Sequence, residues 1–212
     1  MSGIVTIAGK SLASLGQCLS SRSMGTPERK SSTVTVPHMS GFWDFSAIYG
    51  GVAYESREVE YVIDIIGEDR QDMMDQLSAL LAWADLAQDE DIYDDDLDGW
   101  HLRGSLESTE FEEGADGESG TLTITFLCQP FLVADDETTS ATTTGTNHVR
   151  NDGMAADLYA WAPGGTATVT MGGVRQSVTS SRSRLATQLM PGDNEVEVSG
   201  SAVTLAWRET RL

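Results

Sequence analysis

The stretch EVEYVIDI, residues 58–65, decides the fold class because apolar and acidic side chains alternate along it. Successive side chains of a strand point to opposite faces, so one face would be apolar and the other carboxylate-rich. The apolar set is Val59, Tyr61, Ile63 and Ile65. A second stretch, TLTITFLC at residues 121–128, alternates in the same way, with threonine on its outer face. Both patterns predict half-buried antiparallel strands.

One segment, residues 69–87, departs from this pattern. Its apolar residues recur at spacings of three and four, which predicts an amphipathic helix that covers a sheet. The stripe consists of Met73, Leu77, Leu80, Leu81 and Ala84, and Trp83 and Leu86 widen it. Asp69 is the predicted N-cap, and Asp72 and Asp75 suit the positive end of the helix dipole.

The last third of the chain predicts several short strands separated by glycine- and proline-containing turns, which is typical of a small β-sandwich. A polar, threonine-rich stretch precedes it, and we interpret residues 137–147 as a linker. The predicted organisation is therefore a first domain at 1–136, the linker, and a second domain at 148–212. The predicted fold class is mainly β, with two β-sandwich-like domains, the first carrying the helix.

The net charge of −20 is concentrated in one region. Residues 68–137 hold 21 acidic and two basic residues, whereas the flanking segments are close to neutral. A surface of this sign repels phosphate, so we expect no sequence-specific nucleic-acid binding and no binding to anionic membranes. We expect no membrane span and no secretory signal, because no apolar run is long enough and the amino terminus lacks a basic segment. Cys18 and Cys128 fit two reduced thiols in a cytoplasm.

Catalytic and metal-binding patterns are weak. The three histidines are scattered, and no nucleophile elbow or phosphate loop is present, so we expect no enzyme and no cofactor. Asp94 to Gly99 begins like a calcium loop, but Ser105 stands where a glutamate ligand belongs, and an exposed acidic turn is the favoured interpretation. Tyr159, Trp161 and Trp207 could form a sugar-stacking platform, although such aromatics more often belong to a core.

The ordered set of motifs along the chain resembles the siphophage distal tail proteins. An extended run leads through a proline, a glycine and an aspartate to a "Y-x-x-R" motif and an alternating strand, and a single helix, an acidic hairpin region and a "W-H-L-R-G" strand follow. The residues that carry this signature are Pro37, Gly41, Asp44, Tyr54, Arg57, Arg103 and Gly104, with the Gly50-Gly51 break between them. The resemblance covers nearly the whole chain and includes Pro191 to Val198 near its end. One departure is the turn His38-Met39-Ser40, where the family favours glycine or aspartate.

The resemblance implies a structural protein that forms a hexameric ring at the tip of a long non-contractile tail. The first domain, with a protruding β-hairpin, would close the ring, while the second, a short galectin-like domain, would splay outward. The implied partners are further copies of the chain, the tail tube protein and a tail-tip hub or baseplate protein, with DNA passing through the ring. The implied location is the virion, after assembly in the host cytoplasm of a phage or prophage.

Two expectations concern particular segments. Residues 107–120 or 88–100 would be the arm that reaches a neighbouring copy. Asp94, Asp95, Asp96 and Asp98 would contribute to a negatively charged lumen or ring face, or else simply to solubility. A carbohydrate-binding module and a tail tube subunit are the alternative functions that the sequence leaves open.

Overall fold

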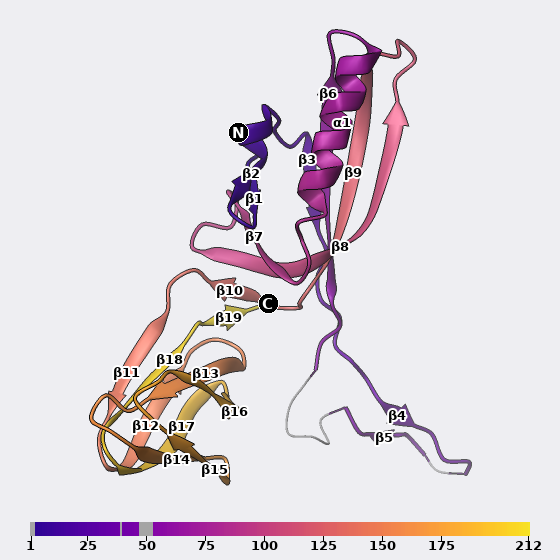
Figure 1. Cartoon of the computed structure of the whole chain (residues 1–212). Coiled ribbons are helices and arrows are strands. Elements are labelled where there is room, and N and C mark those ends of the chain that lie inside the picture. Colours follow the sequence, from indigo (N-terminus) through magenta and orange to yellow (C-terminus); the bar gives the residue numbers. More distant parts are fainter. Residues whose placement is uncertain (1–2, 39, 47–52) are drawn as a thin grey trace. The chain divides into compact units, whose positions relative to one another are not determined.

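The computed structural model describes residues 3–38, 40–46 and 53–212 (Figure 1). The predicted break at Gly50-Gly51, as well as Met39 of the turn, lies outside the described residues. The chain divides into two compact units, Met1–Pro130 and Phe131–Leu212. The fold is mainly β with one α-helix, which confirms the predicted fold class.

The first unit is built on a sheet with the strand order β2-β1-β7-β8-β9-β6-β3. Neighbours in this order pair antiparallel. The strands are β1 (Val5–Ile7), β2 (Lys10–Ser11), β3 (Ser21–Met24), β6 (Arg57–Ile66), β7 (Glu90–Asp94), β8 (Trp100–Glu113) and β9 (Ser119–Cys128). A short 3-10 helix, η1 (Leu12–Leu15), follows β2.

The strands β6 and β9 are the two stretches whose alternation predicted them. They pair antiparallel over ten positions, from Arg57 opposite Cys128 to Ile66 opposite Ser119. Their inward residues are fully or almost fully buried, from Val59 to Ile65 on β6 and from Leu122 to Cys128 on β9. The period of two therefore predicted both strands and their core face.

Helix α1 (Arg70–Ala84) covers this sheet with the face that the sequence predicted, in part. The Asp69 side chain accepts a hydrogen bond from the Asp72 amide and caps the helix, as expected. The buried residues are Met73, Leu77, Leu80, Trp83 and Ala84. Leu81 is 36% exposed, so its predicted place in the stripe is wrong. Trp83 occupies the core in its place and donates its indole N–H to the Lys10 carbonyl.

The sheet changes direction along β8. Residues from His101 to Gly104 pair with β7, and residues from Gly104 onward pair with β9, so Gly104 pairs on both sides. The register shifts between Leu106 and Ser108, which is the signature of a bulge, and bulges bend a strand and increase its twist. The far ends of β8 and β9, residues 107–120, form a hairpin that carries five glutamates, one aspartate and glycine-containing turns.

The second unit is a two-sheet sandwich, as predicted. One sheet has the order β11-β18-β13-β16 and the other β12-β17-β14-β15. Alternate residues of both sheets form a common buried core of Val, Leu, Ala, Met and Trp207. The strands are β11 (Thr138–Thr142), β12 (Gly145–Asn151), β13 (Ala156–Trp161), β14 (Ala167–Met171), β15 (Val174–Val178), β16 (Ser183–Leu189), β17 (Gly192–Gly200) and β18 (Val203–Trp207), with β10 (Leu132–Ala134) pairing with β19 (Thr210–Arg211) beside them.

The segment predicted as a linker at 137–147 instead contains strand β11, a turn and the start of β12, and the compact units divide after Pro130. Thr138 to Thr142 pair with β18 over five positions. Thr142 is buried, and its hydroxyl donates to the Val203 carbonyl at 2.8 Å. Threonine is β-branched and favours strands, so a threonine-rich stretch can form a strand at a sheet edge as readily as it can form a solvated linker.

Candidate assembly surface

A two-stranded arm between β3 and β6 carries a cluster of exposed apolar side chains. Its two strands, β4 (Thr33–Val34) and β5 (Trp43–Asp44), pair with each other and, among the described residues, with no other strand (Figure 1). Backbone contacts continue the antiparallel course toward its base: Lys30 N to Ala53 O at 2.9 Å, Glu55 N to Glu28 O at 2.7 Å, and the bridge between Arg29 and Tyr54.

One face of this arm is apolar. Val34 lies directly opposite Trp43, and Phe45 lies two residues beyond Trp43, so all three share a face. Their exposed fractions are 48%, 58% and 40%, and Phe42, on the other face, is 63% exposed. An isolated two-stranded ribbon is only marginally stable in water, and a contiguous exposed apolar patch marks an interaction site. This apolar face, Val34, Trp43 and Phe45, is the strongest candidate for assembly.

The arm also differs from the rest of its unit in charge. Residues 31–43 contain no formally charged side chain, and Arg29 and Lys30 precede them. Residues 57–130 hold 21 acidic and three basic residues, which gives −18. The arm can therefore approach a body of this kind without the repulsion that two acidic surfaces would experience.

The signature residues of the arm shape its tip and its base. Gly41 has a φ of +92°, a conformation that a side chain disfavours, and Pro37 lies in the preceding turn region. Asp44 accepts a hydrogen bond from the Ser46 amide at 2.8 Å, and the bonds from Ser46 lower the pKa of Asp44. His38 also has a positive φ, 68°, which is where the family favours glycine or aspartate.

Of the two segments predicted to reach a neighbouring copy, one lies inside the sheet, and the other is a hairpin for which the contact stays a prediction. Residues 88–100 contain β7, which lies inside the sheet between β1 and β8, so they do not form a free arm. Residues 107–120 are the hairpin end of β8 and β9. Arg70 of the helix holds Glu113 of this hairpin through Nε at 2.9 Å, and this contact lowers the pKa of Glu113.

Arg57, the arginine of the "Y-x-x-R" motif, is buried, with 4% of its surface exposed. Its Nε and one terminal nitrogen both donate to the Pro130 carbonyl, at 3.0 and 2.5 Å. The other terminal nitrogen lies 3.2 Å from the Met24 sulfur. Burial lowers the pKa of Arg57. Arg57 thus ties the start of β6 to the residue that ends the first unit.

The "W-H-L-R-G" strand places its arginine and glycine in different environments. Arg103 forms an ion pair with Asp89 at 3.0 Å, and this pair lowers the pKa of Asp89. Gly104 lies opposite Cys128, and a Cβ there would be 2.6 Å from the Cys128 sulfur and 2.7 Å from the Leu127 carbonyl. Gly104 is therefore required by the close approach of two backbones.

We expect Gly104→Ala to lower the free energy of unfolding by about 1–3 kcal/mol, because an overpacked core must shift backbone to accept a methyl group. Denaturant titration of both proteins measures the difference. Gly164→Ala is the matched control, since its nearest atoms would lie 3.8 Å from the new Cβ, which is ordinary contact. Equal losses in the two variants would contradict the explanation.

The four aspartates predicted to line a lumen do not form one exposed set. The Asp94 side chain is fully buried and pairs with Arg22 of β3, which also contacts Asp95 at 3.0 Å and Asp96 at 2.9 Å. The burial of Asp94 removes it from any solvent-facing wall and raises its pKa. Asp95, Asp96 and Asp98 are exposed. Arg22, 72 residues away in sequence, is the partner that sequence reasoning missed.

Asp94→Asn should change how stability depends on pH. A carboxyl whose pKa is raised by folding holds its proton more tightly in the folded protein. The stability that this carboxyl contributes is therefore fully present at pH values below its pKa in the unfolded chain. It is lost as the pH rises through its pKa in the folded protein. Denaturant titration at several pH values measures the free energy of unfolding of the wild type and of Asp94→Asn. We expect the wild-type value minus the variant value to fall with rising pH. A difference that grew with pH would contradict the raised pKa.

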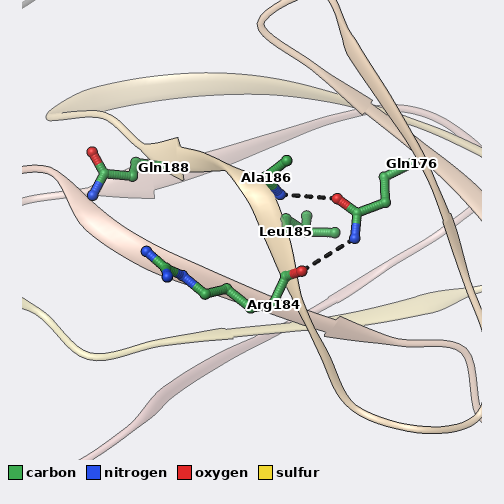
Figure 2. Close-up of a pocket in the computed structure, with 5 residues that line it drawn as sticks. All are labelled: Gln176, Arg184, Leu185, Ala186 and Gln188. Carbon is green, nitrogen blue, oxygen red and sulfur yellow. Dashed lines mark hydrogen bonds between the residues drawn. The ribbon is translucent and has the colours of Figure 1, made fainter.

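In the second unit, the hollow drawn in Figure 2 lies at a sheet edge whose backbone groups already have a partner. The Gln176 side chain, from β15, accepts a hydrogen bond from the Ala186 amide at 2.9 Å and donates to the Arg184 carbonyl at 3.1 Å. It therefore satisfies backbone groups of β16, an edge strand of the other sheet. Occupied edges resist strand addition, so this one is a poor site for assembly.

The three aromatics of the alternative sugar platform do not lie together. Trp207 is 4% exposed and belongs to the core, whereas Tyr159 and Trp161 lie on the outer face of β13. The Arg182 guanidinium carbon is 4.5 Å from the Tyr159 ring centroid and 5.8 Å from that of Trp161. Glu137 forms an ion pair with Arg182 and holds this guanidinium over the rings.

Neither a metal-ligand cluster nor a membrane-spanning helix is found in the part of the chain that the structure describes. No three histidine, cysteine or acidic side chains converge there as metal ligands. The calcium-like stretch directs Asp94 to Arg22 instead of to an open loop. No helix of the described residues has the length and apolar character that a bilayer crossing requires.

Comparisons with known proteins identify the fold. No protein-family model and no curated protein sequence matches the chain. The Dit protein of phage SPP1, which is described as a paradigm of the hub adsorption apparatus in phages infecting Gram-positive bacteria, matches with a TM-score of 0.75 and 15% identity over 100% of both chains. Chains of the phage P2 baseplate in its activated conformation give lower scores: 0.47 at 8% identity with calcium, covering 99% of this chain and 98% of that one, and 0.46 at 8% with strontium, covering 96% and 97%. The resemblance to distal tail proteins is thus confirmed at the level of the fold, over the whole chain.

Proposed function

We propose that this chain is a structural distal tail protein of a long-tailed phage, a subunit that performs no bond-making chemistry. Six copies form a ring that joins the tail tube to the hub or baseplate at the tail tip and lets DNA pass. The observation that carries this proposal is the full-length similarity of fold to the SPP1 protein. The signature residues add support, since Arg57, Gly104 and Asp44 each have a defined structural task in this fold.

The arm supplies the chemistry that ring assembly needs. A closed ring of identical subunits requires a heterologous interface, in which one patch meets a different patch on the next copy. The apolar face of the arm is such a patch, because its three side chains are largely exposed in a single chain. Burial of these side chains against a neighbour would stabilise the ring.

The experiment that tests the proposal is native mass spectrometry of the purified chain together with negative-stain imaging. We expect a ring of six. A chain that remains monomeric at every concentration, combined with intact tail tips on particles that lack it, would overturn the proposal.

The acidic surface suits the passage of DNA, because carboxylates repel phosphate and gain nothing from counterion release. We infer that Asp95, Asp96 and Asp98 face or border the lumen, whereas Asp94 is structural. Replacing these three by asparagine should slow DNA ejection, and the effect should fade above about 0.15 M salt, where screening acts within about 8 Å. Glu195→Gln with Glu197→Gln, exposed acids of the second unit, is the control. Unchanged ejection rates at all salt concentrations would refute the inference.

A further inference from the structure

The first unit contains an open hollow at the side of helix α1, away from the arm in sequence. Its volume is about 550 Å³. Two apolar side chains border it: Ile66, at the end of β6, is 76% exposed, and Leu15 of η1 is 37% exposed. The full lining is Leu15, Gly16, Gln17, Asp64, Ile66 and Gln76.

The polar side chains of the hollow already have partners within the chain. Gln17 donates to the Gln76 side chain at 2.6 Å, and Gln76 donates to the Ile66 carbonyl at 3.2 Å. Asp64 accepts hydrogen bonds from the hydroxyls of Ser20 and Thr121. What the hollow still offers is therefore apolar surface, at Ile66 above all, and a negative charge at its edge.

We propose that this hollow receives the apolar face of the arm of a second copy, with Trp43 entering it. The inference rests on the proposed ring, because it names the second of the two different patches that a heterologous interface requires. An indole ring buries about 150–250 Å² when it is enclosed, which is the largest gain that any of the three arm side chains can make.

The absence of charge on the arm favours a copy of this chain as the occupant. The arm segment 31–43 is uncharged, and the cations beside it are balanced by neighbouring acids, since Lys30 pairs with Glu55 at 3.4 Å. The hollow is edged by Asp64, and Gln76 also contacts Asp72 at 2.9 Å. An uncharged apolar face can approach these carboxylates without repulsion, whereas the acidic surfaces of two bodies repel each other.

Cysteine cross-linking tests this contact directly. Cys18 is exposed and follows Gln17, whereas Cys128 is buried, and burial raises its pKa to about 12, so only Cys18 reacts readily. The substitution Ser32→Cys places a thiol beside the apolar face, because the Phe45 amide donates a hydrogen bond to the Ser32 carbonyl. It leaves the three apolar side chains of that face unchanged. A short bismaleimide should then join neighbouring subunits into a ladder of up to six chains.

Two control proteins give each outcome a meaning. Ser32→Cys combined with Cys18→Ser should show no cross-linked species, and a cross-linked dimer in that protein would mean that arms pair with arms, which overturns the inference. Val174→Cys, an exposed position of the second unit, should also show none. A ring that forms without a Ser32-to-Cys18 ladder refutes the docking site but leaves the ring in place, whereas a chain that forms no ring refutes the proposed function itself.

A second measurement does not depend on cross-linking. Ile66→Asp places a carboxylate at the most exposed apolar residue of the hollow, so we expect ring formation to need about tenfold more protein, or more, in native mass spectrometry. Val174→Asp, an equally drastic change at an exposed site outside the hollow, should leave the concentration dependence unchanged. Equal effects of the two substitutions would contradict the assignment of the hollow.

Discussion

Replacing Val34, Trp43 and Phe45 together by serine is expected to abolish the ring while the single chain stays folded. These side chains lie on one face of the arm and are largely exposed, so the monomer loses little when they change. Burying two aromatic rings and a valine at each interface would contribute roughly 3 kcal/mol or more, which corresponds to about a hundredfold in affinity. Sedimentation or native mass spectrometry of the variant measures the shift from ring to monomer.

The control for this triple variant is Val174→Ser with Met190→Ser, which removes apolar side chains of comparable exposure from the second unit. That protein should form rings as wild type does. If the arm variant still forms rings at wild-type concentrations, the apolar face of the arm has no role in assembly. If it fails to fold, circular dichroism of the monomer reveals this, and the single variant Trp43→Ser then repeats the test.

The core of both units could be predicted from sequence because burial enforces a strict period. At β6 and β9 one face must be apolar, since a shift of one residue would turn every side chain to the wrong side. The same logic separates the two tryptophans of the second unit. Val203, Leu205 and Trp207 alternate on the buried face, whereas Ala160 is buried and Trp161, its neighbour, points outward. Comparing each tryptophan with the alternating apolar residues of its own strand could therefore have assigned Trp207 to the core instead of to the sugar platform.

The arm could not be located in this way. Val34 and Val36 alternate with polar residues as a core strand does, and the pattern is the same whether the apolar face meets the chain's own sheet or another molecule. Only the three-dimensional structure distinguishes the two, because β4 and β5 pair with each other and leave Trp43 exposed. The sequence signal that does survive is the absence of charge over residues 31–43.

The acidic segment illustrates a second limit. Asp94 to Asp98 read as one solvated run, yet a strand ends at Asp94, and Arg22 of a strand far away in sequence pairs with it. Ion pairs of this kind depend on sheet order, and the order β2-β1-β7-β8-β9-β6-β3 is set by long-range pairing that local patterns do not encode. The Tyr61 hydroxyl lies beside the same carboxylate, and burial together with this charge raises the pKa of Tyr61 well above its ordinary value.

Arg57→Ala should be the most destabilising single substitution among the signature residues. The guanidinium holds the Pro130 carbonyl with two hydrogen bonds, and no carboxylate pairs with it in the residues that the structure describes. Truncation leaves the part-buried Pro130 carbonyl without this donor and opens a cavity beside Met24, and these losses together should lower the free energy of unfolding by about 3 kcal/mol. Arg57→Lys should recover little of this loss, because an ammonium group lacks the planar fork that reaches one oxygen with two nitrogens.

Cys128 offers a local readout of this prediction, because it pairs with Arg57 across β6 and β9 and is buried. In a Cys18→Ser background, Arg57→Ala should speed the labelling of Cys128 by a thiol reagent, since opening of this end of the sheet exposes the sulfur. Arg175→Ala, at an exposed position of β15, should change neither stability nor labelling beyond about 0.5 kcal/mol. An Arg57→Ala protein as stable as the Arg175→Ala control would mean that the carbonyl of Pro130 finds another donor, and the arginine of the motif would then serve a contact outside this chain.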